Sequence, residues 1–426
     1  MDIYNLISFL GLFGLMFIAW ACSKNRRNVN WRTIFWGIAL QLAFALFVFR
    51  VPAGLFLFNW INDVVIKILS FANAGTYFVF GPLAVPPGAT GEMGEKSIGF
   101  ILAFQALPAV IFFSALMSLL YFCGIMQKIV KVFSLIFTKL MKISGAEALC
   151  TSSNMVVGIE SVFTIRPYLD EMTLSELCMI LTAGMATIAS TVMAIYVGFL
   201  YSEFPTIAGH LVSASMLSAP AAIVMSKLLY PEEEKPLTLG QVVQGHYEKS
   251  SSWVEAIIRG SNEGVKLAVG IVALLLSFLG LLSMLNWAVS GVTHLTLEKI
   301  LSFIFYPFSF LMGVPFEDIP KVSTLLGERA IVTELVSYKH LASYITSGEL
   351  VNPRSIFIAT YSLCGFAHIA SLAIFVGGVA ALSPNRAKDL AKLGFRALFA
   401  ATLACMMTGA VAGVFSSSTS NLILKF

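Results

Sequence analysis

Long apolar runs almost free of charge are the feature of this sequence that most constrains its fold. A membrane-crossing helix needs about 20 predominantly apolar residues. Eight runs meet this requirement: 5–22, 33–52, 98–124, 174–201, 207–229, 264–289, 355–382 and 395–421. Charged residues make up only 12% of the chain, about half of the share found in soluble proteins. The sequence therefore predicts an all-α integral membrane protein, and its balanced charge indicates no nucleic-acid partner.

Two shorter segments between the predicted spans, 145–169 and 315–346, contain glycine, proline and charged residues. Irregular backbone at membrane depth is tolerated only where protein or a water-filled cavity surrounds it. We therefore expect both segments to be re-entrant hairpins. Four other segments are apolar with scattered polar residues and are expected to be amphipathic helices along the membrane interface: 56–73, 126–142, 252–263 and 295–311.

The distribution of basic residues predicts the orientation of the helices, because short cytoplasmic loops carry an excess of Lys and Arg. The connections after the first, third, fifth and seventh predicted spans are rich in these residues, and the opposite connections are poor in them. Both termini are therefore expected outside. In this arrangement the first hairpin enters from the cytoplasm and the second from outside.

A short internal repeat links the two halves of the chain. The sequence Ala186-Thr187-Ile188-Ala189-Ser190 recurs with one change as Ala367-His368-Ile369-Ala370-Ser371, and each copy follows a hairpin that carries a glutamate. Because the hairpins enter from opposite faces, the copies form an inverted repeat. Many secondary transporters are built from inverted repeats and bind their substrate where the repeats meet. The alternative is a chance match between alanine-rich helices.

Ionisable residues inside a membrane are by default candidates for a functional site. Glu160 and Glu334 lie in the two hairpins, and His368 lies in the second copy of the repeat. Asn154, together with carbonyl groups exposed near Gly158, would suit a hard cation, which prefers oxygen ligands. His368 can hydrogen-bond a hydroxylated solute or change protonation. The alternative for His368 is a core residue that is satisfied by its neighbours.

Three motifs resemble the concentrative nucleoside transporter family. Residues 327–338, Gly-Glu-Arg-Ala-Ile-Val-Thr-Glu-Leu-Val-Ser-Tyr, resemble the family pattern Gly-x-Lys-x-x-x-Asn-Glu-Phe-Val-Ala-Tyr, and residues 365–371 resemble its Gly-Phe-Ala-Asn motif and the serine that follows. In the first hairpin, residues 154–160 and the pair at 166–167 resemble Asn-x-x-Val-Gly-Gln-Thr-Glu and Arg-Pro, with one residue missing beside Ile159. The resemblance covers nearly the whole chain.

This resemblance implies a homotrimer in which scaffold helices surround a mobile transport domain. The implied fold has eight transmembrane helices and two re-entrant hairpins. We expect 1–142 to form scaffold and interfacial helices, and 143–230 to form the first hairpin and the transport helices of the first repeat. Residues 231–311 would form a cytoplasmic loop, a scaffold helix and interfacial helices. Residues 312–426 would form the second hairpin and the transport helices of the second repeat.

The family resemblance also implies which residues bind the substrate. Glu334 and Ser371 would hold the ribose hydroxyls, and Glu160 would reach the base. Phe366 would line the pocket, and His368 would take the place of the family asparagine as a neutral ligand. A carboxylate can accept two hydroxyl hydrogen bonds and an aromatic ring can shield a base, so these residue types suit a nucleoside.

A cation site is implied by the same resemblance. It would use side chains or carbonyl groups of Asn154, Val157, Thr187, Ile188 and Thr191. Because these groups supply hard oxygens without a carboxylate, sodium is the favoured coupling ion. Proton coupling is the alternative, since Glu160, Glu334 and His368 are all protonatable. No cofactor is expected.

The predicted function is ion-coupled import of nucleosides across a bacterial inner membrane, with membrane lipid around the protein. The transport domain would move like an elevator to give alternating access. Alternatives are transport of a nucleobase or another small hydroxylated solute, a channel, and a membrane enzyme. The enzyme alternative is disfavoured because the sequence has no HExxH or GxSxG motif that would supply a metal site or a nucleophile.

Overall fold

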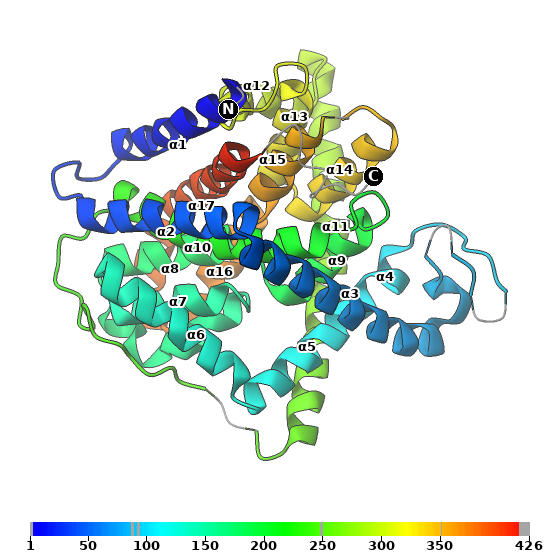
Figure 1. The fold of residues 1–426 in the computed structure, drawn as a ribbon, viewed down its shortest axis with the longest axis horizontal. Coiled ribbons are helices and arrows are strands. Elements are labelled where there is room, and N and C mark those ends of the chain that lie inside the picture. Colours follow the sequence, from blue (N-terminus) through cyan, green and yellow to red (C-terminus); the bar gives the residue numbers. More distant parts are fainter. Residues whose placement is uncertain (1–2, 87–88, 92–93, 248–249, 351, 417–426) are drawn as a thin grey trace.

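The computed structural model describes residues 3–86, 89–91, 94–247, 250–350 and 352–416, and within these ranges the chain is helical, with isolated β-bridges as its only strand-like pairing (Figure 1). Eight helical segments are long and apolar enough to cross a membrane: Ile3–Ala21, Trp31–Arg50, Pro52–Ala84, Leu102–Phe122, Leu174–Leu200, Ile207–Leu229, Trp253–Thr293 and Pro384–Phe415. This confirms the predicted multi-pass, all-α membrane fold. Seven of the eight overlap predicted spans, whereas Pro52–Ala84 was not predicted as a span and the predicted span 355–382 is not among the eight.

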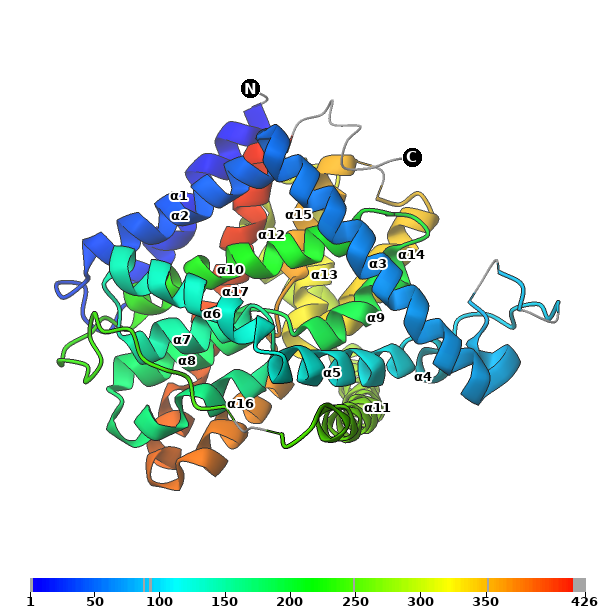
Figure 2. The same cartoon turned by 60° about the horizontal axis from the view of Figure 1, so that its bottom comes forward.

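The first difference is α3 (Pro52–Phe80), which includes the segment 56–73 that we expected to be interfacial. It follows α1 (Ile3–Ala21) and α2 (Trp31–Arg50), which run in opposite directions. In both views α3 leads away from α2 instead of returning beside it (Figures 1 and 2). With its 20 residues, α2 is long enough to cross the bilayer. A helix that turns away where α2 ends can therefore lie along the membrane interface. The interfacial position of α3 stays a prediction.

The middle of the chain contains shorter helices and one very long helix. They are α4 (Leu102–Gln105), α5 (Leu107–Phe122), α6 (Ile125–Ile136), α11 (Trp253–Thr293) and α12 (Leu297–Leu311). A π-helical turn, Phe137–Met141, extends α6. The prediction of a separate interfacial helix at 252–263 is wrong. This segment is the first part of the 41-residue helix α11, whose turns continue without a break into the apolar run.

Small residues explain how α11 packs against α5. A Cβ atom at Gly260 would lie 2.6 Å from the Ser114 carbonyl oxygen, and one at Gly264 would lie 2.7 Å from the Ile111 Cα atom. Glycines four residues apart let two helices approach until their backbones touch. Helices α5 and α11 therefore form one tightly packed pair, and most of the remaining surface of α11 is exposed.

Two units with the same order of elements confirm the internal repeat. Each consists of a hairpin, a broken helix and a long helix. The first unit contains α7 (Gly145–Asn154), the 3-10 helix η3 (Ile159–Glu171), α8 (Leu174–Ala186), α9 (Ser190–Leu200) and α10 (Ile207–Leu229). The second contains α13 (Ile319–Ile331), α14 (Glu334–Thr346), α15 (Pro353–Leu363), α16 (Ile369–Leu382) and α17 (Ala387–Phe415).

The second difference concerns the helix breaks. We expected continuous helices at 174–201 and 355–382, but extended backbone at 187–189 and 364–368 interrupts them. Thr187 has φ −107° and ψ 169°, and Gly365 has φ 149°. Hydropathy did not reveal the breaks because apolar residues continue on both sides. Discontinuous helices free backbone groups in the middle of the bundle, where they can bind ligands.

Helices α8, α10 and α17 form the centre of the molecule. The spans that contain α8 and α10 are each 89% buried, compared with 17% for α11. Helices α1 and α2, blue in Figure 1, pack against α17 and α10 and lie away from the α5–α11 pair. The predicted last span, 395–421, belongs to α17 as far as Phe415, and its residues 417–421 lie outside the described ranges.

Candidate functional site

Each hairpin places a glutamate at the beginning of its second arm. Glu160 lies in the first turn of η3, after Gly158, and Glu334 is the first residue of α14. Thr333 caps α14, because its hydroxyl oxygen accepts a hydrogen bond from the Val336 amide at 3.5 Å. The free amide groups and the positive dipole end of a helix stabilise a carboxylate at this position. The two hairpins thus present their carboxylates in the same way.

A cavity of about 130 Å³ is lined by all the residues that we expected to bind substrate. These residues are Glu160, Glu334, Phe366, His368 and Ser371. They come from both hairpins and from the break between α15 and α16. Helix α11 closes another side with the apolar side chains of Leu267, Ile271, Leu274 and Leu275. The cavity therefore has a polar wall from the repeats and an apolar wall from α11.

A second, wider cavity of about 610 Å³ adjoins the first. The two cavities share Gly158, Glu160, Thr191 and Leu267 as lining residues. The wider one is also lined by aromatic and charged side chains: Tyr121, Phe163, Tyr247, Arg259 and Glu263. Glu160 is exposed at the boundary between the cavities. A solute that moved between them would pass this carboxylate.

Glu334 has one oxygen held by the protein and one that is available. The Tyr196 hydroxyl donates to Oε1 at 2.6 Å. His368 Nε2 lies 3.0 Å from Oε2, but the ring N–H is not aligned for a hydrogen bond, so the buried Oε2 has no hydrogen-bond partner. An unpaired carboxylate oxygen in a buried site is costly unless a donor reaches it. Glu334 is therefore ready to accept a hydrogen bond from a ligand.

Sequence reasoning missed Tyr196. This residue lies on α9, it is fully buried, and its ring stacks on Tyr338 with the centroids 4.6 Å apart. It is surrounded in sequence by apolar residues and belongs to no motif. The only available signal was a polar hydroxyl on a strongly apolar helix.

His368 caps a helix and contacts Glu334 at the same time. Its Nδ1 atom accepts a hydrogen bond from the Ser371 amide at 3.1 Å, which caps α16. An accepting Nδ1 carries no proton, so this hydrogen-bond pattern assigns the proton to Nε2, which faces Glu334. This tautomer is the neutral form of the ring. Both nitrogens therefore face protein groups, with Nδ1 capping α16 and Nε2 lying beside the Glu334 carboxylate.

Ser371 and Phe366 shape the same break. The Ser371 hydroxyl contacts the carbonyl oxygens of Phe366 and of His368, the latter at 2.7 Å. The proton of this hydroxyl is thus used within the break, its oxygen accepts a hydrogen bond from the His368 amide at 3.3 Å, and one lone pair of that oxygen remains for a ligand. The Phe366 ring is partly exposed in the cavity and lies edge-on to the His368 ring at 6.4 Å.

The residues expected at the cation site fall into two groups. Asn154, Thr187 and Ile188 are buried, and Val157 and Thr191 are half-buried at the wider cavity. The Asn154 Oδ1 atom is buried without a hydrogen-bond partner. An unsatisfied, neutral oxygen in the protein interior is the kind of ligand that a hard cation prefers.

Ser215 of α10 brings the first hairpin and the first helix break together. Its hydroxyl oxygen lies 3.2 Å from the Met155 carbonyl oxygen and 3.4 Å from that of Ile188. The Ser190 amide also donates to the Val156 carbonyl at 3.2 Å. Of these carbonyls only that of Ile188 belongs to the expected cation site, and those of Met155 and Val156 belong to the neighbouring first hairpin. Ser215 was also missed, because nothing in its local sequence marks it.

The donor set fits an alkali cation better than a transition metal. Within the described residues there is no group of three or more His, Cys, Asp or Glu side chains that could hold a metal ion. Asn154 and the carbonyl groups supply neutral oxygens, which suit a hard cation. The residues present therefore fit a sodium ion.

Comparison with known proteins shows to which family the chain belongs. Residues 10–83 match the model for the N-terminus of Na+ dependent nucleoside transporters, and residues 210–413 match the model for their C-terminus. Residues 103–203 match a model described as nucleoside recognition. The chain belongs to the concentrative nucleoside transporter family. Its relatives are transporters and not enzymes, so the enzyme alternative has no support.

Relatives of this family align over nearly the whole chain. Solute carrier family 28 member 3 of Rattus norvegicus is 38% identical over 97% of this chain, which spans 59% of that protein. An uncharacterized transporter of Haemophilus influenzae is 36% identical over 96% of this chain and 97% of its own length. The chain thus has nearly the length of the bacterial relative and about three-fifths of the length of the mammalian one.

Solved structures of a concentrative nucleoside transporter have the same fold. The transporter CNTnw in an inward-facing, substrate-bound state has a TM-score of 0.87 and 32% identity, with 97% of this chain and 99% of that chain covered. A doubly substituted form of CNTnw in an outward-facing state has a TM-score of 0.86 and 30% identity, with coverage of 97% and 98%. The same fold therefore occurs in conformations that open to opposite sides.

Proposed function

We propose that this protein is a sodium-coupled importer of nucleosides that works by alternating access. The observation that carries the proposal is the cavity in which carboxylates from both hairpins meet the second helix break. Family membership and the inward- and outward-facing states of CNTnw support it. Both hairpins would belong to one moving unit, and movement of that unit past the helices that close the cavity, such as α11, would open it to either side.

Nucleoside recognition would rest on Glu334. A ribose hydroxyl would donate to its unpaired Oε2, while Tyr196 and His368 hold the carboxylate in place. Hydrogen bonds to a charged acceptor are roughly twice as strong as neutral ones. Glu160 would contact the base, Phe366 would cover it, and Ser371 would accept a hydrogen bond. Another hydroxylated solute or a nucleobase is the alternative substrate.

Sodium would bind between the first hairpin and the first helix break. Asn154 Oδ1 and the carbonyl of Ile188 would be buried ligands, with Val157, Thr187 and Thr191 completing the site. The Na+ dependence in the family description supports sodium over protons. Proton coupling remains the alternative, and the contact between His368 and Glu334 is the place where a proton would act.

The moving unit would contain more of the N-terminus than its sequence suggested. We expected 1–142 to be scaffold. Buried polar contacts tie α1 to the second repeat, because Arg354 of α15 donates to Ser8 at 2.7 Å and to the Tyr4 carbonyl at 2.8 Å. Helices α1 and α2 would thus travel with both repeats past a scaffold built on α5 and α11. A homotrimer would form through that scaffold, within the lipid of a bacterial inner membrane.

Uptake by proteoliposomes tests the proposal. Radiolabelled uridine and adenosine would be supplied under a sodium gradient at equal pH, and then under a pH gradient without sodium. We expect accumulation above equilibrium only with the sodium gradient. Accumulation only with the pH gradient would replace sodium by protons, and passive equilibration would indicate a channel. Competition by unlabelled nucleosides, nucleobases and ribose would identify the substrate class.

A further inference from the structure

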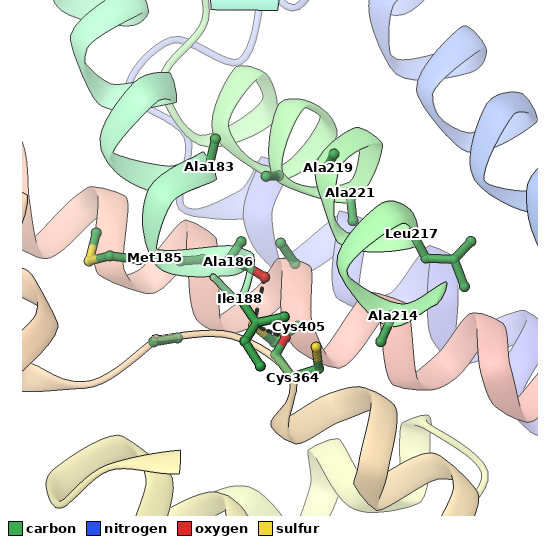
Figure 3. Close-up of a cluster of buried hydrophobic side chains, with 14 of the residues drawn as sticks. Ala183, Met185, Ala186, Ile188, Ala214, Leu217, Ala219, Ala221, Cys364 and Cys405 are labelled. Atoms are coloured by element: carbon green, nitrogen blue, oxygen red, sulfur yellow. Dashed lines mark hydrogen bonds between the residues drawn. The ribbon is translucent and has the colours of Figure 1, made fainter. Parts of the chain in front are cut away.

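The two broken helices touch at their breaks, at a point that we name the crossing: Ala186, Cys364, Gly365 and Cys405. Gly365 has φ 149°, a conformation that side chains rarely adopt. A Cβ atom at Gly365 would lie 2.7 Å from the Ala186 carbonyl oxygen and 2.6 Å from the Cys405 Sγ atom. The two repeats therefore lie too close at this point for a side chain on Gly365. Figure 3 shows Ala186, Cys364 and Cys405 near one another at the crossing.

The Cys405 thiol lies between two free helix ends. Cys405 belongs to α17, and its Sγ atom is 3.7 Å from the Ala186 carbonyl oxygen and 3.6 Å from that of Cys364. Ala186 is the last residue of α8 and Cys364 is the cap of α15, so both carbonyls lack a partner in the next turn. A thiol has one proton and can donate to only one of them at a time. The thiol proton therefore has two alternative acceptors, one from each broken helix.

Both candidate sites begin next to the crossing. Thr187 and Ile188, which we place at the cation site, directly follow Ala186, while Phe366 and His368 follow Gly365. Close-packed interiors transmit displacement because they have no free volume to absorb it. A shift of the first break would thus move the second, and with it the groups that line the substrate cavity.

The geometry points to the crossing as the physical link between cation binding and substrate binding. This inference rests on the sodium-coupled function proposed above. Sodium bound at Thr187 and Ile188 fixes the direction of the Ala186 carbonyl. That direction selects the carbonyl to which the Cys405 thiol donates, and so sets the positions of Phe366 and His368. Gly365 and Cys405 are positioning residues that contact neither ligand.

The coupling between the two ligands is the quantity to measure. The Kd for uridine would be measured on the full chain in detergent, once with saturating sodium and once with choline in place of sodium. The coupling factor is the Kd in choline divided by the Kd in sodium. Such factors are typically about 5- to 150-fold, and they are reciprocal for the two ligands. We expect Cys405→Ala to lower the ratio by at least about threefold and toward unity, because the shared donor is lost.

Two further variants separate this role from simple packing. Cys405→Ser keeps a proton donor and is expected to retain most of the wild-type ratio. Cys178→Ala is the matched control. Like Cys405, Cys178 is a fully buried thiol, but it lies on α8 and away from the crossing. It should leave the ratio unchanged. A structural role alone would lower thermal stability without this pattern of ratios.

An unchanged ratio in well-folded Cys405→Ala protein would overturn the link. If that variant does not fold, Cys405→Val removes the same donor while it fills the space, and the same two outcomes apply. A ratio of one in the wild-type protein would refute sodium coupling itself, and the link with it. Failure of the link alone is therefore distinguishable from failure of the proposed function.

Discussion

Removal of the charge of Glu334 is the sharpest test of the substrate site. The residue is 3% exposed, one carboxylate oxygen accepts from Tyr196, and the other has no hydrogen-bond partner. Glu334→Gln keeps the shape but replaces one acceptor oxygen by an NH2 group, which cannot accept from a ligand hydroxyl. Loss of a charge-assisted hydrogen bond in a desolvated site costs about 2–5 kcal/mol. This corresponds to roughly a 30-fold to several thousand-fold weaker affinity.

The assay is equilibrium binding of uridine and adenosine to purified protein, followed by uptake into proteoliposomes. Glu349→Gln is the matched control, since this glutamate lies just after the second hairpin, is 47% exposed and pairs with Lys321 at the surface. It should bind nucleosides normally. A Glu334→Gln protein that elutes and melts like the wild type, yet binds uridine within about threefold of it, would remove Glu334 from the substrate site.

Tyr196 provides an independent check on the same carboxylate. Tyr196→Phe removes the hydroxyl that donates to Oε1 and leaves the stacked ring in place. A hydrogen bond to a charged group contributes about 1.5–3 kcal/mol. We therefore expect affinity to fall by about 10- to 100-fold, a smaller loss than for Glu334→Gln. Equal affinity in the variant and the wild type would mean that Tyr196 does not orient Glu334.

Three further predictions concern the cation, selectivity and movement. Thr191→Val should abolish the stimulation of uptake by sodium while nucleoside binding without sodium is retained, and uptake that still depends on sodium would exclude Thr191 as a ligand. His368→Asn should keep partial transport and change the ranking of nucleosides in a competition panel, whereas an unchanged ranking would limit His368 to capping α16. Ala109 of α5 and Ala194 of α9 share a small buried cluster, so a cross-link between cysteines at these positions should trap the transporter, and undiminished uptake would refute movement of α9 past α5.

The sequence by itself determined the class of protein and its main segments. Long apolar runs are incompatible with a water-exposed surface, so the multi-pass α-helical fold follows from composition and run length alone. The two hairpins were also predictable, because glycine, proline and charge in short segments between spans are tolerated only inside protein. The five-residue repeat was sufficient to relate the two halves. These signals are local, so they can be recognised in the sequence without knowing which other helices each segment packs against.

Helix continuity was less predictable. The break at 364–368 and the unbroken course of α11 through 252–263 both contradicted the expected boundaries. Apolar residues continue on both sides of the break, and the polar residues at the beginning of α11 do not interrupt the helix. Hydropathy therefore predicted both helix boundaries wrongly. Backbone conformation at these places is set by packing against other helices, such as the contact of Gly365 with Ala186.

Only the tertiary structure decided how the site is assembled. Tyr196 and Glu334 are 138 positions apart, and Ser215 reaches Met155 across 60 positions. Neither pair leaves a pattern in the chain, because a hydrogen bond between distant segments requires only one suitable atom on each. The types of residue that bind a hydroxylated solute could be read from the sequence. The question of which oxygen is held by the protein and which is free for a ligand depends on distances that only the packed helices define.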